Sequence, residues 1–335
     1  MKTYIFNLLL LSSLYAHGAQ YTVYAHGIID GPAQINRFKD VIATPLVAPV
    51  TFPDAQIISG WNLNGIIGQL SSLYGQKVNS TNSFYGKHIN RNAMYMGQEA
   101  DLEAISATIA QVPTQESMIL YGCSRGAAAL LTYLGKYNPS NIAALVLDAC
   151  PADLPATLHI KLASCGIHPT WANTIFTTLF PQYDSSTAIT PFNAIALIQN
   201  KDLPILLIHS KKDHVVPYIH SLQLYQQLLD HGFTNVHLIL VPHGRHAYIL
   251  QDEPVAPLYA QAVHSFYKKY NLPYDATIAQ DTMQETMLTK EEIEQKTAAY
   301  QESIQNVLYA KRAIYSAVIA ITIMLLYEAK QRSLE

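Results

Sequence analysis

Residues 117–129 read SMILYGCSRGAAA, and this stretch decides the fold class. Ser117–Gly122 is a short apolar run, as expected of a strand buried on both faces of a parallel sheet, and Ala127–Lys136 is an alanine- and leucine-rich helical stretch. Between them, Gly122-Cys123-Ser124-Arg125-Gly126 matches the pattern G-x-S-x-G. The pattern predicts a sharp strand-to-helix turn, because side chains at the two glycine positions would collide with neighbouring backbone.

Ser124 is therefore the candidate nucleophile. The predicted turn lifts its hydroxyl above the sheet and sets it beside the N-terminus of a helix, whose dipole favours a developing anion. A five-residue pattern is a weak signal alone. Here it follows a strand and opens a helix, which is the context that the motif requires.

Apolar runs and helical stretches alternate along the rest of the chain. The predicted strands are Tyr21–Ala25, Gln56–Ser59, Ser117–Gly122, Asn141–Leu147, Pro204–His209 and Asn235–Val241. The predicted helices are Gly97–Gln111, Ala127–Lys136, Tyr218–His231 and Val255–Lys269. This alternation predicts an α/β fold with a mostly parallel, doubly wound sheet and helices on both faces. Residues at the carboxyl ends of such strands converge on one edge of the sheet.

The segments that follow two other strands contain an aspartate and a histidine that can complete a triad with the serine. Asp213 lies in Ser210–Pro217, directly after the strand Pro204–His209, and His246 lies in Pro242–Ala247, after the last strand. The order serine, aspartate, histidine is the one expected with a G-x-S-x-G nucleophile. The sequence therefore predicts Ser124, Asp213 and His246 as the catalytic residues.

Other residues compete for the roles of acid and base. Asp148 ends the strand after the nucleophile helix and is a second candidate acid, and His243 is a second candidate base beside Pro242. The remaining histidines close to this edge or in the segment after Leu147 are interpreted as structural or solvated: His159, His168, His209, His214 and His220.

The arrangement of Ser124, Asp213 in a D-x-x-V-P loop and His246 in a G-x-H element resembles the α/β-hydrolase family, over roughly residues 21–270. In that family the histidine takes the proton of the serine and later protonates the leaving group, while the aspartate holds the tautomer of the histidine. The resemblance implies an α/β-hydrolase fold and an esterase- or lipase-like serine hydrolase, whose triad needs no cofactor.

The same resemblance implies an oxyanion hole made of two backbone N–H groups. One belongs to Arg125, the residue after the serine, and the other to the loop His26-Gly27-Ile28, at Ile28 in preference to Gly27. The side chain of Arg125 has two interpretations. It binds a carboxylate or phosphate of the substrate, or it pairs with a structural acid.

Residues 1–272 divide into a targeting segment and a domain. Residues 1–19 are predicted to be a signal peptide, because Lys2 precedes an apolar run too short to span a bilayer; the alternative is a buried first helix or strand. Residues 20–272 are the predicted hydrolase domain. Within it, residues 150–200 break the strand–helix rhythm and are interpreted as a cap or a small inserted subdomain.

The C-terminal segments differ in character. Residues 273–310 are predicted to hold a linker and an exposed amphipathic helix, opened by Thr289 and Glu292 in a capping-box pattern. Residues 311–329 contain the apolar run Ala313–Tyr327, about 22 Å of helix against a hydrocarbon core of about 30 Å. A membrane anchor is favoured, because a buried helix should show some polar face; a buried or self-associating helix is the alternative.

The composition excludes several classes of function. The chain has 335 residues, of which 50% are hydrophobic and 13% charged, with a net charge of −3, so no basic field is available to hold nucleic acid. It contains no P-loop, dinucleotide fingerprint or metal-ligand spacing, and we expect neither a cofactor nor a metal. Cys150 and Cys165 either pair or stay free, which the sequence leaves open.

We expect an exported enzyme, extracellular or periplasmic, that cleaves an ester or related acyl bond of a small-molecule or lipid substrate. Apolar and aromatic residues of the insertion favour an apolar acyl or aromatic group: Trp171, Phe176, Leu179, Phe180 and Phe192. A peptidase or thioesterase stays open, because fold does not fix the substrate. The alternative from another class of function is an inactive scaffold protein with a hydrolase fold. The presence of all three triad residue types argues against it.

Overall fold

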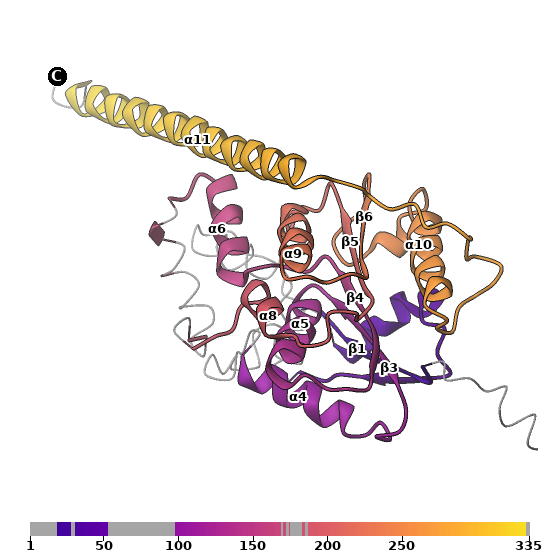
Figure 1. Cartoon of the computed structure of the whole chain (residues 1–335). Coiled ribbons are helices and arrows are strands. Elements are labelled where there is room, and N and C mark those ends of the chain that lie inside the picture. The colour runs from indigo at the N-terminus through magenta and orange to yellow at the C-terminus, as the bar shows by residue number, and fades with distance from the viewer. Residues whose placement is uncertain are drawn as a thin grey trace, which may run out of the picture.

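The described part of the chain folds around one parallel six-stranded sheet (Figure 1). The computed structural model describes residues 19–27, 31–52, 98–168, 170–171, 174, 183–184 and 187–332. The strands are β1 (Tyr21–Ala25), β2 (Leu46–Pro49), β3 (Met118–Cys123), β4 (Ile142–Asp148), β5 (Ile205–Ser210) and β6 (Val236–Val241). Each pairs in parallel with its neighbours in the order β2-β1-β3-β4-β5-β6. The predicted parallel sheet is confirmed.

The strand order places the ends of β1 and β3 at the point where the chain reverses direction across the sheet. From β1 the chain moves outward to β2 and then returns past β1 to add β3, β4, β5 and β6 on the other side. In open α/β sheets, ligands bind beyond the carboxyl ends of the strands at such a switch point. His26-Gly27 follows β1 and Ser124 follows β3, so both lie at this point.

The sheet is buried on both faces because its strands are apolar throughout. All residues of β3 and β5 are buried. Alternate residues of β3 enter two separate cores, Leu120 with the helices of one face and Tyr121 with those of the other. Burying apolar surface on both sides at about 25 cal/mol per Å² is the main force that holds the layers together.

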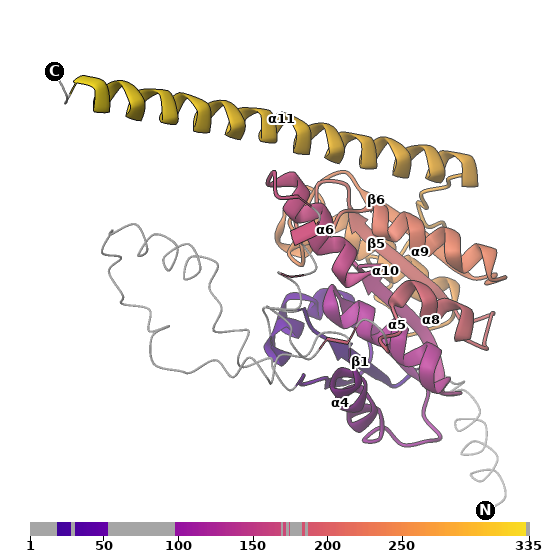
Figure 2. The same cartoon turned by 90° about the vertical axis from the view of Figure 1, so that its left-hand side faces the viewer.

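The helices cover the two faces unequally (Figures 1 and 2). They are α4 (Glu99–Ile109), α5 (Arg125–Tyr137), α6 (Leu154–Ser164), α8 (Pro191–Leu197), α9 (Ile219–Asp230), α10 (Ala256–Lys269) and α11 (Lys290–Arg332), with short 3-10 helices η1 (Pro32–Arg37), η2 (Lys39–Val41) and η4 (Ile249–Gln251). Residues of α4, α5, α8 and α9 share one core, and those of α10 and the 3-10 helices share the other. The predicted helices on both faces are confirmed.

One strand was not expected from the sequence. β2 is only four residues long, lies at an edge of the sheet, and leaves Leu46 and Val47 exposed, so it has neither the length nor the apolar alternation of a typical strand. Pro49 ends it, as is tolerated only at a sheet edge. The strand predicted at Gln56–Ser59 lies outside the described residues, as do residues 1–18 of the predicted signal peptide.

The segment between β4 and β5, predicted to be a cap and called the cap below, is helical in its described part. Its described residues hold α6 and α8 and no strand. Asp153 caps α6 by accepting a hydrogen bond from the amide of Ala156, and Thr190 caps α8 in the same way from Asn193. The cap contacts the loop after β5, because Lys161 of α6 donates a hydrogen bond to the carbonyl of His214.

The residues predicted as a linker cover the free edge of β6. The amide of Thr286 donates to the carbonyl of Leu238 at 2.7 Å, and the Thr286 hydroxyl accepts from the amide of Leu240 at 3.0 Å. Beside them, Glu285 bonds His237 at 2.7 Å. An open strand edge invites pairing with other chains, and this segment closes it.

The C-terminal helix α11 is continuous where the sequence suggested two segments. Thr289 and Glu292 form the expected capping box: the Glu292 carboxylate accepts from the Thr289 amide at 2.8 Å and the Thr289 hydroxyl from the Glu292 amide at 3.2 Å. Ile293 and Leu308 are buried against the domain, whereas the C-terminal part of the helix projects beyond it (Figures 1 and 2).

The packing of α5 on β1 depends on Gly126. A Cβ at Gly126 would lie 2.0 Å from the carbonyl oxygen of Ala25, well inside contact distance. This oxygen belongs to the backbone and cannot turn aside as a side chain can. The first turn of α5 therefore approaches β1 as closely as it does only because residue 126 has no side chain.

Gly126→Ala should destabilise the domain by about 3 kcal/mol, because α5 would have to move away from β1. Gly31→Ala is the matched control: residue 31 is extended, with φ −130°, and a Cβ there meets nothing within 4 Å. Denaturant unfolding of both variants measures the difference. Equal stability of Gly126→Ala and the wild type would contradict the packing argument.

Candidate active site

Ser124 sits on a strained turn between β3 and α5. Its backbone has φ 54° and ψ −118°, a left-handed φ that non-glycine residues rarely adopt. The Ser124 amide donates to the carbonyl of Asp148 at 2.8 Å, which ties the turn to the end of β4. Gly122 permits the turn, because a Cβ there would lie 2.5 Å from the Cα of Ala127.

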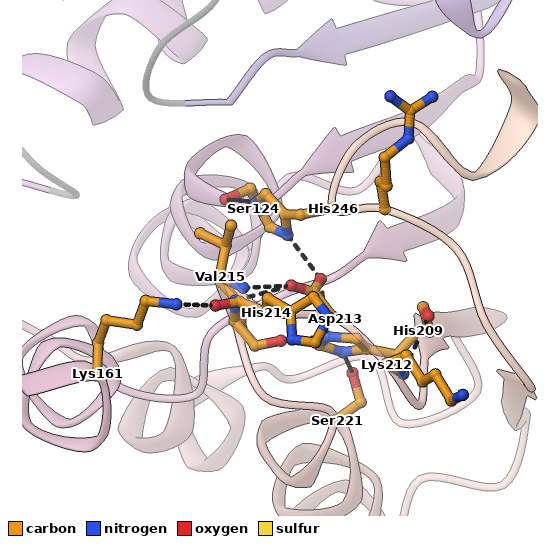
Figure 3. Close-up of polar contacts among 12 residues, drawn as sticks. Ser124, Lys161, His209, Lys212, Asp213, His214, Val215, Ser221 and His246 are labelled. Carbon is orange, nitrogen blue, oxygen red and sulfur yellow. Dashed lines mark hydrogen bonds and ion pairs between the residues drawn. The ribbon is translucent and has the colours of Figure 1, made fainter. Parts of the chain in front are cut away.

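His246 faces the serine from the loop after β6. Its Nε2 lies 2.9 Å from the Ser124 Oγ, and its Nδ1 lies 2.7 Å from Oδ2 of Asp213 (Figure 3). The loop is held by Arg245, whose amide and side chain both donate to Asp252, at 2.6 and 3.1 Å. A carboxylate only accepts, so Nδ1 carries the proton and Nε2 is left to accept from the serine.

Asp213 is held in place by the backbone of its own loop. Its Oδ1 accepts from the amides of Val215 at 2.7 Å and Val216 at 3.0 Å. Its side chain is 1% exposed. Burial alone would raise the pKa of Asp213, but hydrogen bonds from His209 and His246 outweigh it and hold the pKa well below the usual range. Asp213 is therefore ionised across the physiological pH range.

The structure brings together Ser124, Asp213 and His246 and separates them from their sequence rivals. Asp148 is fully buried, neither of its carboxylate oxygens has a hydrogen-bond partner among the described residues, and His246 bonds Asp213 instead. His243 is exposed on the loop that precedes His246. The three residues form the hydrogen-bonded series that nucleophilic catalysis by serine needs.

The loop after β1 borders Ser124, as expected for a second wall of the candidate site. A Cβ at Gly27 would lie 3.7 Å from the Cβ of Ser124. The amide of Gly27, however, donates to Oε1 of Gln34 at 2.8 Å, and the same oxygen accepts from the Tyr24 hydroxyl at 2.9 Å. The Gly27 N–H is thus already engaged, and Ile28, the preferred donor, lies outside the described residues.

The side chain of Arg125 pairs with a structural acid, which decides between its two sequence interpretations. Its Nε lies 3.0 Å and its Nη2 2.5 Å from the two carboxylate oxygens of Asp101 in α4. The guanidinium also lies 4.6 Å from the ring centre of Phe52, and the residue is 1% exposed. Buried in this way, the cation holds α5 to α4 and is not presented to a substrate.

Several residues that support the site were not predicted from the sequence. His209 and Ser221 lie behind Asp213, Lys161 bonds the loop from the cap, and Gln34 fixes the loop of Gly27. The one available signal was the position of His209 at the end of a strand, four residues before Asp213. The contacts of the other three depend on how distant segments pack.

The described residues contain no group of three or more His, Cys, Asp and Glu side chains arranged to hold a metal ion. All three cysteines are free thiols, so Cys150 and Cys165 are not bonded to each other. Cys150 is buried, which raises the pKa of its thiol, whereas Cys165 is exposed at the end of α6.

A sequence profile of the prolyl oligopeptidase family (Peptidase_S9) matches residues 99–271, just over half of the chain and the part that contains all three site residues. The chain belongs to this family. Its fold is that of the α/β-hydrolases, as the resemblance of the sequence implied.

Individual relatives are distant. The uncharacterized protein YfhR of Escherichia coli K12 is 28% identical over 137 residues, which cover 41% of this chain and 40% of that protein. A puromycin-hydrolyzing peptidase of Mycobacterium tuberculosis superposes with a TM-score of 0.51 at 15% identity, over 79% of this chain and 36% of that one. An acylaminoacyl peptidase of Pyrococcus horikoshii superposes with a TM-score of 0.49 at 15% identity, over 83% of this chain and 40% of that one. The chain thus matches less than half the length of each relative.

Asp148 should make the stability of the fold depend on pH. Burial raises its pKa to about 7, above the value of about 3.9 in an unfolded chain. The bound proton therefore stabilises the fold below pH 4, and this contribution declines as the pH rises to about 7.

Asp148→Asn cannot ionise, so its melting temperature should fall less than that of the wild type between pH 5 and pH 9. Asp40→Asn, at an exposed carboxylate, is the control and should follow the wild type. Thermal unfolding monitored by circular dichroism measures all three. Parallel curves for Asp148→Asn and the wild type would show that Asp148 does not titrate in this range.

Proposed function

We propose that the protein is a serine hydrolase that cleaves a carboxylic ester through an acyl-enzyme, with Ser124, His246 and Asp213 as its triad. The observation that carries the proposal is the pair of contacts on one imidazole, 2.9 Å to the Ser124 Oγ and 2.7 Å to the Asp213 carboxylate. No cofactor or metal takes part in the proposed reaction.

In the first half of the reaction, the Ser124 Oγ attacks the carbonyl carbon of the ester while its proton passes to Nε2 of His246. The positive charge that develops on the imidazole is stabilised by the ionised Asp213. As the tetrahedral intermediate collapses, the ester C–O bond breaks and the proton on Nε2 passes to the leaving alcohol. The acyl group stays bound to Ser124.

In the second half, water replaces the alcohol. His246 takes a proton from the water as it attacks the acyl carbon, and returns that proton to the Ser124 Oγ when the acid leaves. The oxyanion of each intermediate requires backbone donors, for which we propose the amides of Arg125, at the start of α5, and Ile28.

Ester cleavage is favoured by the apolar character of the cap, and peptide cleavage by the family. The cap carries exposed Trp171 and apolar residues toward which an acyl chain could pack. The matched family is named for a peptidase, and a serine nucleophile can also form an acyl-enzyme from an amide. An amide leaves less readily than an alkoxide, so a site with both activities turns over esters faster.

The serine is tested with a fluorophosphonate probe and a soluble ester such as p-nitrophenyl butyrate. The wild-type protein should be labelled, and Ser124→Ala should abolish both labelling and turnover. His246→Ala and Asp213→Asn should lower kcat by about 10⁴-fold. His243→Ala, which changes the rival base, should retain the activity of the wild type.

A folded wild-type protein that is neither labelled nor active would favour the inactive scaffold. Equal turnover of an N-acylated amino-acid p-nitroanilide and of the matched ester would favour the peptidase. Loss of activity in His243→Ala would place the base elsewhere than at His246.

We also propose that the end of α11 inserts into a lipid membrane and that the enzyme is exported. One helix of the described chain, in the span Lys290–Met324, is long and apolar enough to cross a membrane, with a mean hydropathy of 1.5 in its most apolar window. Ile314, Ile319 and Met324 are more than half exposed, and in a helix they point in directions about 140° apart. Apolar residues on all sides suit lipid, whereas a docked helix needs only one apolar stripe.

Ile319→Asp combined with Ile323→Asp should release the full chain from phosphatidylcholine–phosphatidylglycerol vesicles, since each aspartate costs about 3 kcal/mol in a membrane helix. Tyr309→Asp, at an exposed position before the apolar run, should stay bound. Vesicle flotation measures binding. A wild type that does not float, but dimerises in gel filtration, would show that the segment self-associates.

A further inference from the structure

His209 lies directly behind the proposed triad acid. It is the penultimate residue of β5, is fully buried, and precedes Asp213 by four residues. Figure 3 shows its ring between Asp213 and the first turn of α9, which carries Ser221. The proposed reaction uses Ser124, His246 and Asp213 and leaves His209 without a role.

The contacts of His209 fix the tautomer and the direction of its ring. Its Nε2 lies 2.8 Å from the carbonyl of Val216, which only accepts, so Nε2 carries a proton. Its Nδ1 lies 2.7 Å from the hydroxyl of Ser221, which donates to Nδ1 in the neutral ring. Held at both nitrogens, the ring cannot turn without losing a buried hydrogen bond.

Val216 links His209 to the N–H groups that hold Asp213. The Val216 carbonyl accepts from His209, and the Val216 amide donates to Oδ1 of Asp213. A shift of this peptide segment would move the donors of Val215 and Val216 together. The carboxylate would then turn relative to His246.

His209 also faces the other oxygen of the same carboxylate. Its Nε2 lies 3.4 Å from Oδ2 of Asp213, the oxygen that accepts from Nδ1 of His246. Both imidazoles thus approach Oδ2 while the two backbone amides hold Oδ1. A buried carboxylate restrained from two sides has one orientation, and misplacing a catalytic group by 1 Å can cost about 100-fold in rate.

We propose that His209 is a positioning residue, which orients the Asp213 carboxylate toward His246 through its Nε2–H and the Val216 peptide. The proposal rests on the proposed triad. A merely structural His209 would stabilise the fold without changing the rate of the chemical step, and the experiment has to separate these two roles.

Two amide substitutions test the two hydrogen bonds of the His209 ring separately. His209→Gln can place its amide nitrogen near the position of Nε2 and keep the donor to Val216. The shorter His209→Asn reaches only the position of Nδ1 and keeps the contact with Ser221 while losing that donor. Both variants put a neutral amide in the same buried site, so they are matched for polarity.

With p-nitrophenyl butyrate, His209→Asn should lower kcat by about 10- to 100-fold with KM changed less than twofold. His209→Gln should recover kcat to within about fivefold of the wild type, even if both variants lose similar thermal stability. In proton NMR, the downfield Nδ1–H resonance of His246 should broaden or move upfield in His209→Asn and be retained in His209→Gln. This resonance can be recorded without substrate, so it reports on the site independently of activity.

The positioning role is wrong if folded His209→Asn keeps both the kcat and the His246 resonance of the wild type, or if the two variants lose kcat equally with the resonance unchanged. Failure of the proposed function is a different result: the wild type itself is neither labelled nor active. The NMR comparison still tests whether His209 orients Asp213 in that case.

Discussion

The strained turn at Ser124 is the constraint on which the rest of the site depends. Its left-handed backbone, with φ 54°, is maintained by the hydrogen bond to the carbonyl of Asp148 and by the close approach of α5 to β1 at Gly126. The turn is therefore held by contacts with β1 and β4 as well as by its place at the end of β3. A candidate nucleophile placed in this way cannot be assembled by its local sequence alone.

Buried charge is paired on both sides of this turn. On the helix side, Arg125 and Asp101 form a buried pair that joins α5 to α4, so the cation beside Ser124 holds the two helices together and is not exposed to a substrate. On the other side, Asp213 stays ionised although burial opposes it, because His209, His246 and two backbone amides surround the carboxylate. An ionised carboxylate is what a histidine base requires of its partner.

The C-terminal helix joins the catalytic domain at the cap. Lys311 donates to the carbonyl of Ser164 and Tyr315 to that of Cys165, where α6 ends, and Gly166 leaves room for both side chains. At the other end of α6, His220 of α9 bonds Thr157. The proposed membrane segment thus begins where α11 leaves the cap, which would hold the cap close to the lipid surface.

The sequence by itself determined the parallel sheet, the strand-to-helix turn and the order of Ser124, Asp213 and His246, because apolar runs, glycine positions and strand ends are local signals. Only the tertiary structure shows that His246 bonds Ser124 and Asp213, since Asp148 and His243 lie near the same sheet edge. The structure also paired Arg125 with Asp101, found β2 at the edge and put His209 behind the acid. These outcomes depend on how segments far apart in the chain pack together. A single sequence does not tell how close such segments come in space.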